Sequence, residues 1–286
     1  MHRSFIRTLA VTAAVVCPAA LLAACAGEES GGASSGGDDL VVATGSQFPP
    51  MEYIDTDSNK LTGFDIELGE AIADELGVSL SWEQMDYNQF LTSLKSSRVN
   101  MVMGGMGDTA ERQSEATFVD YLETGTQLYT SLAAQKEHGI KELTDLCGQT
   151  VAASANSNYS TYIDKWSKEN CTGKNEPAIK VLDTDGSPAA RLQLEQGRAV
   201  AVAQTTETVH YQMEVEPDTY ALLGEPINSE YYGIGFAPDD ESRQTDVREA
   251  LETLIEDGTY GEITEKWGLD GQAIETPTVN LKPVEE

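Results

Sequence analysis

The chain has 286 residues and carries 48 Asp and Glu against 18 Lys and Arg, which gives a formal net charge of −30. Nucleic acids and anionic membrane surfaces repel such a polyanion, so the charge argues against both as partners. The length allows one large domain or two lobes that each bury a core.

The first 24 residues have the pattern of a secretory signal peptide. Arg3 and Arg7 precede an apolar run over residues 9–24 that is too short and too rich in small residues to span a membrane. The run ends in Leu-Ala-Ala-Cys, which resembles a bacterial lipobox. That resemblance implies cleavage before Cys25, lipidation of its thiol and a protein anchored at the outer face of the cell membrane. Residues 25–39 are mostly Gly, Ser and acid, and predict a flexible tether.

Two cysteines remain for the folded part of the chain. Cys17 leaves with the signal peptide and Cys25 carries the anchor, so Cys147 and Cys171 are left. In an oxidising compartment an isolated pair most simply forms a disulfide. The pair has no His cluster near it and makes a poor metal site, so we expect neither a metal nor a cofactor.

The folded part begins with a predicted strand over residues 40–43, which stops at a loop that carries Phe48. Phe48 either covers a ligand or closes the core. Residues 63–76 have apolar side chains four apart, which predicts an amphipathic helix that ends at Gly77 with its acids facing solvent.

The next predicted elements repeat the strand-then-helix order. A strand is expected over residues 78–82, and Asp86 is expected to cap a helix over residues 87–95. A buried strand end follows at residues 101–103. Two such units predict a doubly wound α/β lobe, in which small ligands bind beyond the carboxyl ends of the strands.

The loop after this strand has the pattern of an anion site. Gly104, Gly105 and Gly107 allow the backbone to turn and to approach a ligand closely. Thr109 is then the expected N-cap of a helix with Arg112 in its first turn, where a cation opposes the macrodipole unless an anion lies beside it. Backbone N–H groups, a hydroxyl and a guanidinium that converge here would hold a small carboxylate. The alternative is a glycine-rich loop with a solvated arginine.

Several spaced segments resemble family 3 of the bacterial extracellular solute-binding proteins, the polar amino-acid receptors of ABC importers. The resemblance covers about residues 40–269. The segments that carry it are 63–76, which is similar to the family signature, the Thr-x-x-Arg of 109–112, and the C-terminal motifs 231–236, 257–260 and 266–268.

The resemblance implies an α/β, two-lobed, periplasmic-binding-protein-like fold of type II. Each lobe is then a doubly wound sheet with flanking helices, and the chain crosses between the lobes at two hinges. We expect lobe 1 to comprise residues 40–126 and 229–272 and lobe 2 residues 127–228. The tail, residues 273–286, is expected to be an ordered wrap or a loose end.

In lobe 2 we expect a strand over residues 150–154, a turn into a helix that ends near Asn170, a helix over 189–194 and a strand over 197–203. The cysteines bracket the first strand and helix, so a bridge would staple the turn between them.

The resemblance also implies a ligand site. Arg112 would pair with a carboxylate, Gly105 and Thr109 would supply backbone and hydroxyl donors, and Phe48 and Tyr87 would form an aromatic clamp unless they belong to the core. The expected lobe 2 donors are Asn156, Ser157 and Asn158.

Two positions depart from the family pattern. Thr205 lies where the family has an Asp that pairs with the ligand's α-ammonium, and Glu207 is a substitute two residues on. Gly107 lies where the family has a Ser or Thr that helps to hold the carboxylate. The departures put a standard α-amino acid in doubt, and a cation without a primary ammonium would suit aromatic faces.

The expected function is that of a lipid-anchored, extracytoplasmic substrate-binding protein of an ABC importer. It would capture an amino acid or a derivative between closing lobes and deliver it, as a monomer, to a membrane permease. One alternative is a receptor for a betaine or an ectoine-like solute. Another is a lyase-like enzyme of the same fold that uses Glu207 as acid or base, since His138 and His210 indicate only surface or core positions.

Overall fold

Two five-stranded sheets organise the structure, a computed structural model that describes residues 39–155 and 157–280. The expected signal peptide, Cys25, nearly all of the expected tether and Asn156 lie outside the described residues. The described residues belong to one compact unit. Each sheet is the centre of one lobe, and the two-lobed α/β fold expected from the sequence is confirmed.

The sheet of lobe 1 has the strand order β5-β1-β6-β13-β7. Strands β1, β5 and β6 are parallel, whereas β13 runs antiparallel to β6 and β7. A separate small sheet, β2-β3-β4, follows β1. The strand bounds are β1 Leu40–Thr44, β2 Gln47–Phe48, β3 Glu52–Ile54, β4 Leu61–Thr62, β5 Leu80–Gln84, β6 Met101–Val102, β7 Thr117–Thr124 and β13 Glu230–Phe236.

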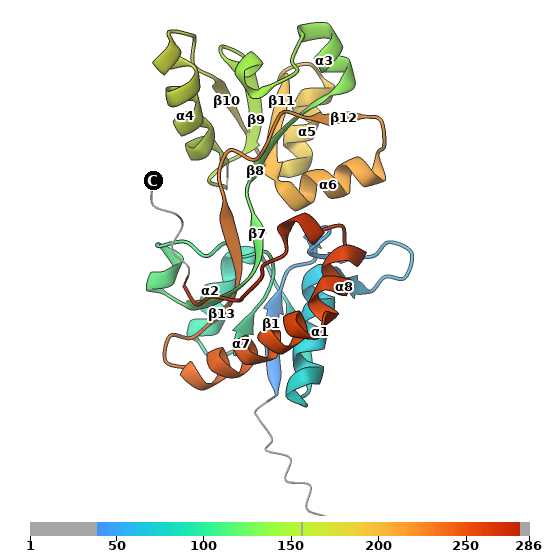
Figure 1. The fold of residues 1–286 in the computed structure, drawn as a ribbon, viewed down its shortest axis with the longest axis vertical. Coiled ribbons are helices and arrows are strands. Elements are labelled where there is room, and N and C mark those ends of the chain that lie inside the picture. The colour runs from blue at the N-terminus through green and yellow to red at the C-terminus, as the bar shows by residue number, and fades with distance from the viewer. Residues whose placement is uncertain (1–38, 156, 281–286) are drawn as a thin grey trace, which may run out of the picture. The chain divides into compact units, whose positions relative to one another are not determined.

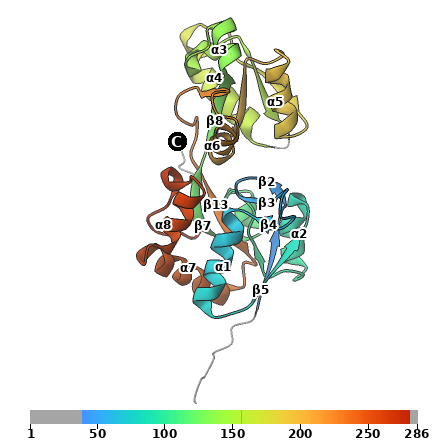
Figure 2. The same ribbon diagram turned by 90° about the vertical axis from the view of Figure 1, so that its right-hand side faces the viewer.

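Helices cover both faces of this sheet (Figure 2), as buried strands of a doubly wound fold require. One face packs against α1, α7 and α8, with Phe64, Leu251 and Ile263 in the core. The other face packs against α2 through Phe90. The helix bounds are α1 Phe64–Leu76, α2 Phe90–Lys95, α7 Glu241–Glu256 and α8 Thr259–Lys266.

The sheet of lobe 2 has the order β10-β9-β11-β8-β12, with β10, β9 and β11 parallel. Helix α4 packs on one face through Ile163, and α3, α5 and α6 pack on the other through Ala134, Leu194 and Val209. The bounds are β8 Thr126–Ser131, α3 Leu132–His138, β9 Thr150–Ser154, α4 Tyr159–Asn170, β10 Lys180–Thr184, α5 Ser187–Glu195, β11 Ala201–Thr205, α6 Thr206–Val215 and β12 Tyr220–Leu222.

The chain passes between the sheets twice, from β7 into β8 and from β12 into β13 (Figure 1). Gly125 is the residue between β7 and β8. A Cβ atom there would lie 2.2 Å from the Asn228 carbonyl oxygen of the second crossing. The two crossings therefore lie against each other, and only glycine allows that approach.

The α1 helix confirms the periodicity argument, and Gly77 ends it in the left-handed conformation. The expectation that its acids all face solvent was wrong, because Asp65 is fully buried. The strand expected at residues 78–82 lies two residues later, since Val78 donates to the Ala73 carbonyl to close the helix.

Two further expectations need correction, and the structure decides between the two alternatives for the tail. Residues 87–89 form a 3₁₀ turn before α2, and the Asp86 side chain makes no capping hydrogen bond. Gly197 has a φ of 68° and closes α5, so β11 begins later than expected, at Ala201. The tail is an ordered wrap as far as Asn280, where the Asp120 N–H donates to the Thr278 carbonyl and the Phe118 N–H to Asn280 Oδ1.

The expected disulfide is confirmed, since Cys147 and Cys171 are bridged across a separation of 24 residues. Cys147 precedes β9 and Cys171 ends α4, so the bridge closes a loop that contains both elements.

We predict that the double variant Cys147→Ser/Cys171→Ser loses about 3 kcal/mol of unfolding free energy, because its unfolded chain is freed from the loop constraint. Urea unfolding of the variant measures this. Wild type in reducing agent should lose a similar amount, and an unchanged midpoint in both would contradict the prediction.

Candidate functional site

A cavity of about 430 Å³ lies between the two lobes, where parallel strands of both sheets end. Lobe 1 lines it with residues 45–48 after β1, residues 85–87 after β5 and the glycine loop after β6. Lobe 2 lines it with residues 157–159 after β9 and with Thr205 at the end of β11. The cavity is thus where ligands bind in open α/β sheets, outside the carboxyl ends of the strands.

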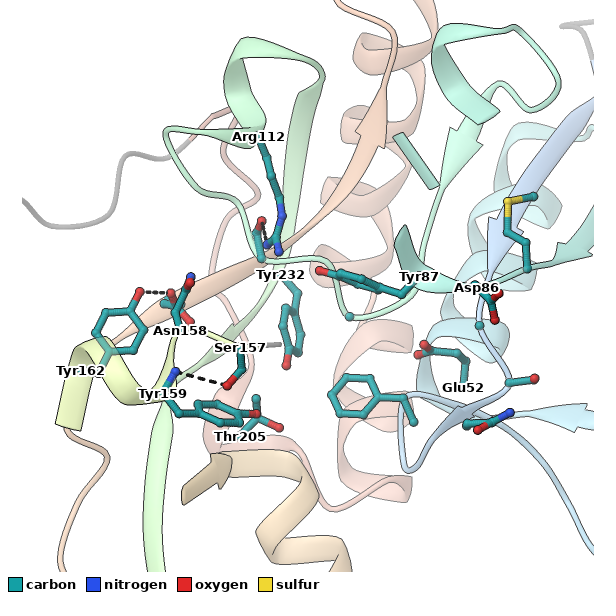
Figure 3. A pocket seen from close by; sticks show the side chains of 18 residues that line it. Glu52, Asp86, Tyr87, Arg112, Ser157, Asn158, Tyr159, Tyr162, Thr205 and Tyr232 are labelled. Carbon is teal, nitrogen blue, oxygen red and sulfur yellow. Dashed lines mark hydrogen bonds between the residues drawn. The ribbon is translucent and has the colours of Figure 1, made fainter. Parts of the chain in front are cut away.

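Arg112 extends into this cavity from the loop after β6, with Tyr87 beside it (Figure 3). Its Nη1 donates to the Gly107 carbonyl oxygen at 2.9 Å, and its guanidinium carbon lies 5.6 Å from the centre of the Tyr87 ring. In the described part of the chain, Arg112 forms no salt bridge with a carboxylate. The guanidinium is therefore held in place by a carbonyl and a ring, and it keeps donors for an anion.

The expectation of a helix that begins at Thr109 was wrong. The chain makes a single 3₁₀ turn at Arg112–Ser114, in which the Thr109 hydroxyl accepts from the Arg112 N–H at 3.3 Å. Thr109 does not line the cavity. The turn is too short to build a macrodipole, so what orients Arg112 is the Gly107 carbonyl and not a helix end.

Gly105 and Gly107 line the cavity and leave space for their neighbours. Gly105 has a φ of 54°, and a Cβ atom on it would lie 2.4 Å from the Phe48 ring. Its N–H donates to Asp65 Oδ2 at 2.9 Å, so that group is engaged within the protein and not free for a ligand. A Cβ on Gly107 would lie 3.1 Å from Arg112 Nη1. Because glycine has no Cβ, the guanidinium can come close enough to donate to the Gly107 carbonyl.

Aromatic rings form the cavity walls. Phe48 is half-buried, packs edge-on against Tyr232 with ring centres 6.3 Å apart, and lines the cavity as well as the core. Tyr87 is 43% exposed, which contradicts the core alternative for this residue. Tyr159 and Tyr162 lie three apart on the first turn of α4 and line the lobe 2 side (Figure 3).

The lobe 2 residues form a turn that is already braced. The Ser157 hydroxyl donates to the Ser154 carbonyl at 2.7 Å and accepts from the Tyr159 N–H at 3.3 Å. Ser157 and Asn158 line the cavity at the start of α4, whereas Asn156 lies outside the described residues. Thr205 also lines it and shares a hydrogen bond with Thr208 at 2.9 Å.

Three carboxyl groups line the cavity together with Arg112: Glu52, Asp86 and Glu230. Glu230 begins β13 and accepts a hydrogen bond from the Tyr162 hydroxyl, so it joins a crossing strand to α4. Glu52 is 3% exposed, and burial and the neighbouring Asp65 raise its pKa well above the usual range of a glutamate. Burial raises the pKa of Asp65 to about 7. The cavity is therefore rich in acid around a single arginine.

Glu207 does not line the cavity, so it is not placed to act as the expected partner of a ligand's ammonium. It is fully buried and accepts hydrogen bonds from the Tyr232 and Thr124 hydroxyls, each at 2.7 Å, and from Gln272 Nε2 at 3.2 Å. Thr124 and Tyr232 belong to the two crossing strands. Glu207 therefore connects the two strands that cross between the lobes.

Sequence reasoning missed Glu52, Glu230, Tyr159 and Tyr162. The tyrosines were detectable in part, because a spacing of three on a first helical turn places two side chains on one face. The burial of Asp65 was detectable too, since Asp65 lies in the same stripe as Leu68 and Ile72. Glu52 and Glu230 carry no local signal, because only the folded chain brings β3 and β13 to the cavity.

The described residues contain neither a cluster of metal ligands nor a membrane-spanning helix. No group of three or more His, Cys, Asp or Glu side chains there could hold a metal ion. None of the helices in the same part of the chain has the length and apolar character needed to cross a membrane.

Comparison with known proteins gives consistent matches. The model of the bacterial extracellular solute-binding proteins, family 3, matches residues 40–270. The L-cystine-binding protein TcyJ of Bacillus subtilis is 27% identical over 80% of this chain and 83% of its own length. The arginine-binding protein ArgT of Corynebacterium glutamicum is 24% identical over 86% and 79%. The structure of an ancestral arginine-binding protein bound to arginine is 31% identical, with a TM-score of 0.66 over 80% of this chain and 97% of that one.

The glycine loop yields a prediction about stability. Gly105→Ala places a Cβ against Phe48 in addition to straining a positive φ, so we expect it to lose about 2–4 kcal/mol of unfolding free energy. Gly139→Ala is the matched control, because Gly139 has a φ of 74° but nothing within 4 Å of its Cβ position. It should lose only about 1 kcal/mol. Equal losses in urea unfolding would show that Phe48 does not constrain the loop.

Proposed function

The chain belongs to family 3 of the bacterial extracellular solute-binding proteins, and on this basis we propose that it captures an amino acid or an amino-acid-like solute between its lobes for an ABC importer. Its relatives bind L-cystine or arginine according to their names. The cavity between the lobes is the proposed ligand site.

The observation that carries the proposal is the cavity-facing guanidinium of Arg112, which has no carboxylate partner in the described part of the chain. A buried or half-buried arginine strongly favours an anionic partner, and its planar fork matches a carboxylate in two hydrogen bonds. Asn158, Tyr159 and Tyr162 at the start of α4 line the same cavity, so their polar side-chain groups are available to the same anion. A carboxylate between Arg112 and α4 would connect the two lobes, which favours closure.

The ammonium of an amino acid pairs best with a negatively charged acceptor. Thr205 is neutral and does not supply one. We propose that Glu230 fills this role, because it lines the cavity next to the lobe 2 turn and is already held by Tyr162. Phe48, Tyr87 and Tyr232 then enclose the apolar part of the ligand. The alternative ligand, a betaine or an ectoine-like solute, would use the same aromatic faces without an ammonium contact.

The lyase-like alternative finds no support at its proposed acid or base. Glu207 is fully buried at the hinge, and its carboxylate oxygens already accept three hydrogen bonds. We propose a receptor that releases its ligand unchanged to a membrane permease and acts as a monomer, outside the cytoplasm and anchored through Cys25.

A thermal-shift screen tests the ligand class first. The protein is heated with single amino acids, cystine, glycine betaine and ectoine, because a ligand at a thousand times its dissociation constant stabilises the folded state by about 4 kcal/mol. A shift with amino acids supports the proposal. Shifts only with betaines or ectoine would assign the site to the alternative ligand class.

The best ligand then tests Arg112. We predict that Arg112→Ala loses more than about 2 kcal/mol of binding free energy in calorimetric titration, because a charged hydrogen-bond pair with the carboxylate is removed. Arg98→Ala is the matched control, since Arg98 lies on the surface and pairs with Glu83 at 2.7 Å outside the cavity. Unchanged affinity in Arg112→Ala would refute the site assignment.

The anchor is tested in bacterial cells grown with radiolabelled palmitate. We predict that wild type incorporates the label and remains with the membrane fraction, whereas Cys25→Ser does neither, because the thioether-linked lipid needs the Cys25 sulfur. Cys147→Ser removes a different cysteine and should still be labelled. Equal labelling of Cys25→Ser and wild type would exclude lipidation at this residue.

A further inference from the structure

A buried pair of carboxyl groups forms one wall of the cavity. Glu52 lies on β3, is 3% exposed and lines the cavity, with its carboxyl group directed inward below the Tyr87 ring (Figure 3). Asp65 lies directly behind it in the first turn of α1 and is fully buried. The two carboxyl groups are electrostatic neighbours, and the presence of Asp65 raises the pKa of Glu52. Neither is used by the proposed contacts of Arg112 and Glu230.

The hydrogen bonds around this pair leave two oxygens without a donor. Asp65 Oδ2 accepts the Gly105 N–H at 2.9 Å, which favours the ionised form of Asp65. Glu52 Oε2 and Asp65 Oδ1 are buried and have no partner among the described residues. Two ionised carboxylates would leave both oxygens as acceptors with nothing to accept, whereas one proton between the groups supplies the missing donor.

The charges that face the pair also favour a retained proton. Glu207 from α6 is a second electrostatic neighbour that raises the pKa of Glu52 and of Asp65, whereas the Tyr121 hydroxyl of β7 lowers the pKa of Asp65. Tyr87 faces Glu52 across the cavity. No Lys, Arg or His of the described chain forms a salt bridge with either carboxyl group. A second negative charge here would therefore be repelled and desolvated with no compensation inside the protein.

Two glycines keep space around the cavity-facing oxygen of Glu52. A Cβ atom on Gly45 would lie 2.8 Å from Glu52 Oε1, and a Cβ on Gly104 would lie 3.3 Å from the same atom. Both glycines thus leave room for Glu52 Oε1, and Glu52 itself lines the cavity. A ligand group that reaches this oxygen would meet a carboxyl group that can become an anion.

We propose that Glu52 and Asp65 share one proton in the empty cavity, and that a positively charged group of the ligand displaces this proton to solvent. The inference rests on the proposed receptor function and narrows its ligand to solutes with a carboxylate for Arg112 and an ammonium or guanidinium group for Glu52. Charge is conserved locally, because the pair goes from one negative charge to two as one positive charge arrives and one proton leaves.

The sign of the pH dependence follows from this exchange. Burial raises the pKa of Asp65 to about 7 and, together with Asp65, raises that of Glu52 further above its usual range. At low pH the pair holds its proton firmly and the cation must displace it. Affinity for a cationic ligand therefore rises with pH, by at most about tenfold per pH unit for one proton released.

Calorimetric titration with L-arginine and its neutral isostere L-citrulline tests the proposal. Titrations in phosphate and in Tris, which differ in ionisation enthalpy, count the protons released on binding. We expect about one proton for arginine near neutral pH and close to none for citrulline. In Glu52→Gln, arginine should release none and its affinity should lose its pH dependence. Glu115→Gln is the control, because Glu115 is exposed and pairs with Lys95 at 2.7 Å outside the cavity.

A measurement without ligand separates this proposal from the receptor function. In protein with ¹³C-labelled carboxyl groups, an NMR titration should find a coupled pair that still retains a proton at pH 7, and this coupling should be lost in Glu52→Gln. Absence of that pair overturns the shared proton. Arginine that binds without proton release, or a cavity that binds only neutral amino acids, overturns the exchange and leaves the receptor function standing. Binding of no amino acid overturns the receptor function and the exchange, while the NMR titration still decides the shared proton.

Discussion

The buried carboxylate of Glu207 is the interaction on which the arrangement of the two lobes depends. It belongs to α6 of lobe 2, yet it accepts hydrogen bonds from Thr124 at the end of β7, from Tyr232 on β13 and from Gln272. A fully buried carboxyl group is stable only when hydrogen-bond partners surround it, so the crossing strands and the C-terminal segment must meet at this point. Tyr232 also lines the cavity, so the contact that joins the crossing strands lies next to the proposed ligand site.

The local field of the cavity differs from that of the whole chain. A net charge of −30 would repel small anions, but Arg112 keeps its guanidinium unpaired by binding a carbonyl and a ring in place of a carboxylate. On the lobe 1 side, Glu52 of β3 and Asp65 of α1 are buried acids. One cation among several acids in the same cavity favours ligands that carry both a negative and a positive group.

Local signals in the sequence predicted the elements whose stability is local. The apolar spacing and Gly77 gave α1, and the strand and helix inside the Cys147–Cys171 loop were located almost to the residue. The order of strands and loops in the sequence also predicted that Arg112 and Tyr87 lie after the ends of lobe 1 strands. The same reasoning could not find Glu52 or Glu230, because their place in the cavity depends on how β3 and β13 pack and not on their neighbours in the chain. It also misjudged Asp65, since polarity was given more weight than its position on the apolar stripe.

The ordered tail changes the exposure of the lobe 1 sheet. Strand β7 is at one edge of the order β5-β1-β6-β13-β7, and a bare edge presents unpaired N–H and C=O groups to any passing strand. Here the Phe118 and Asp120 N–H groups are occupied by Asn280 and Thr278, and Val119 bridges Val279. The C-terminal residues therefore act as a guard strand that denies this edge to a second copy. Copies of this chain are thereby hindered from pairing edge to edge through β7.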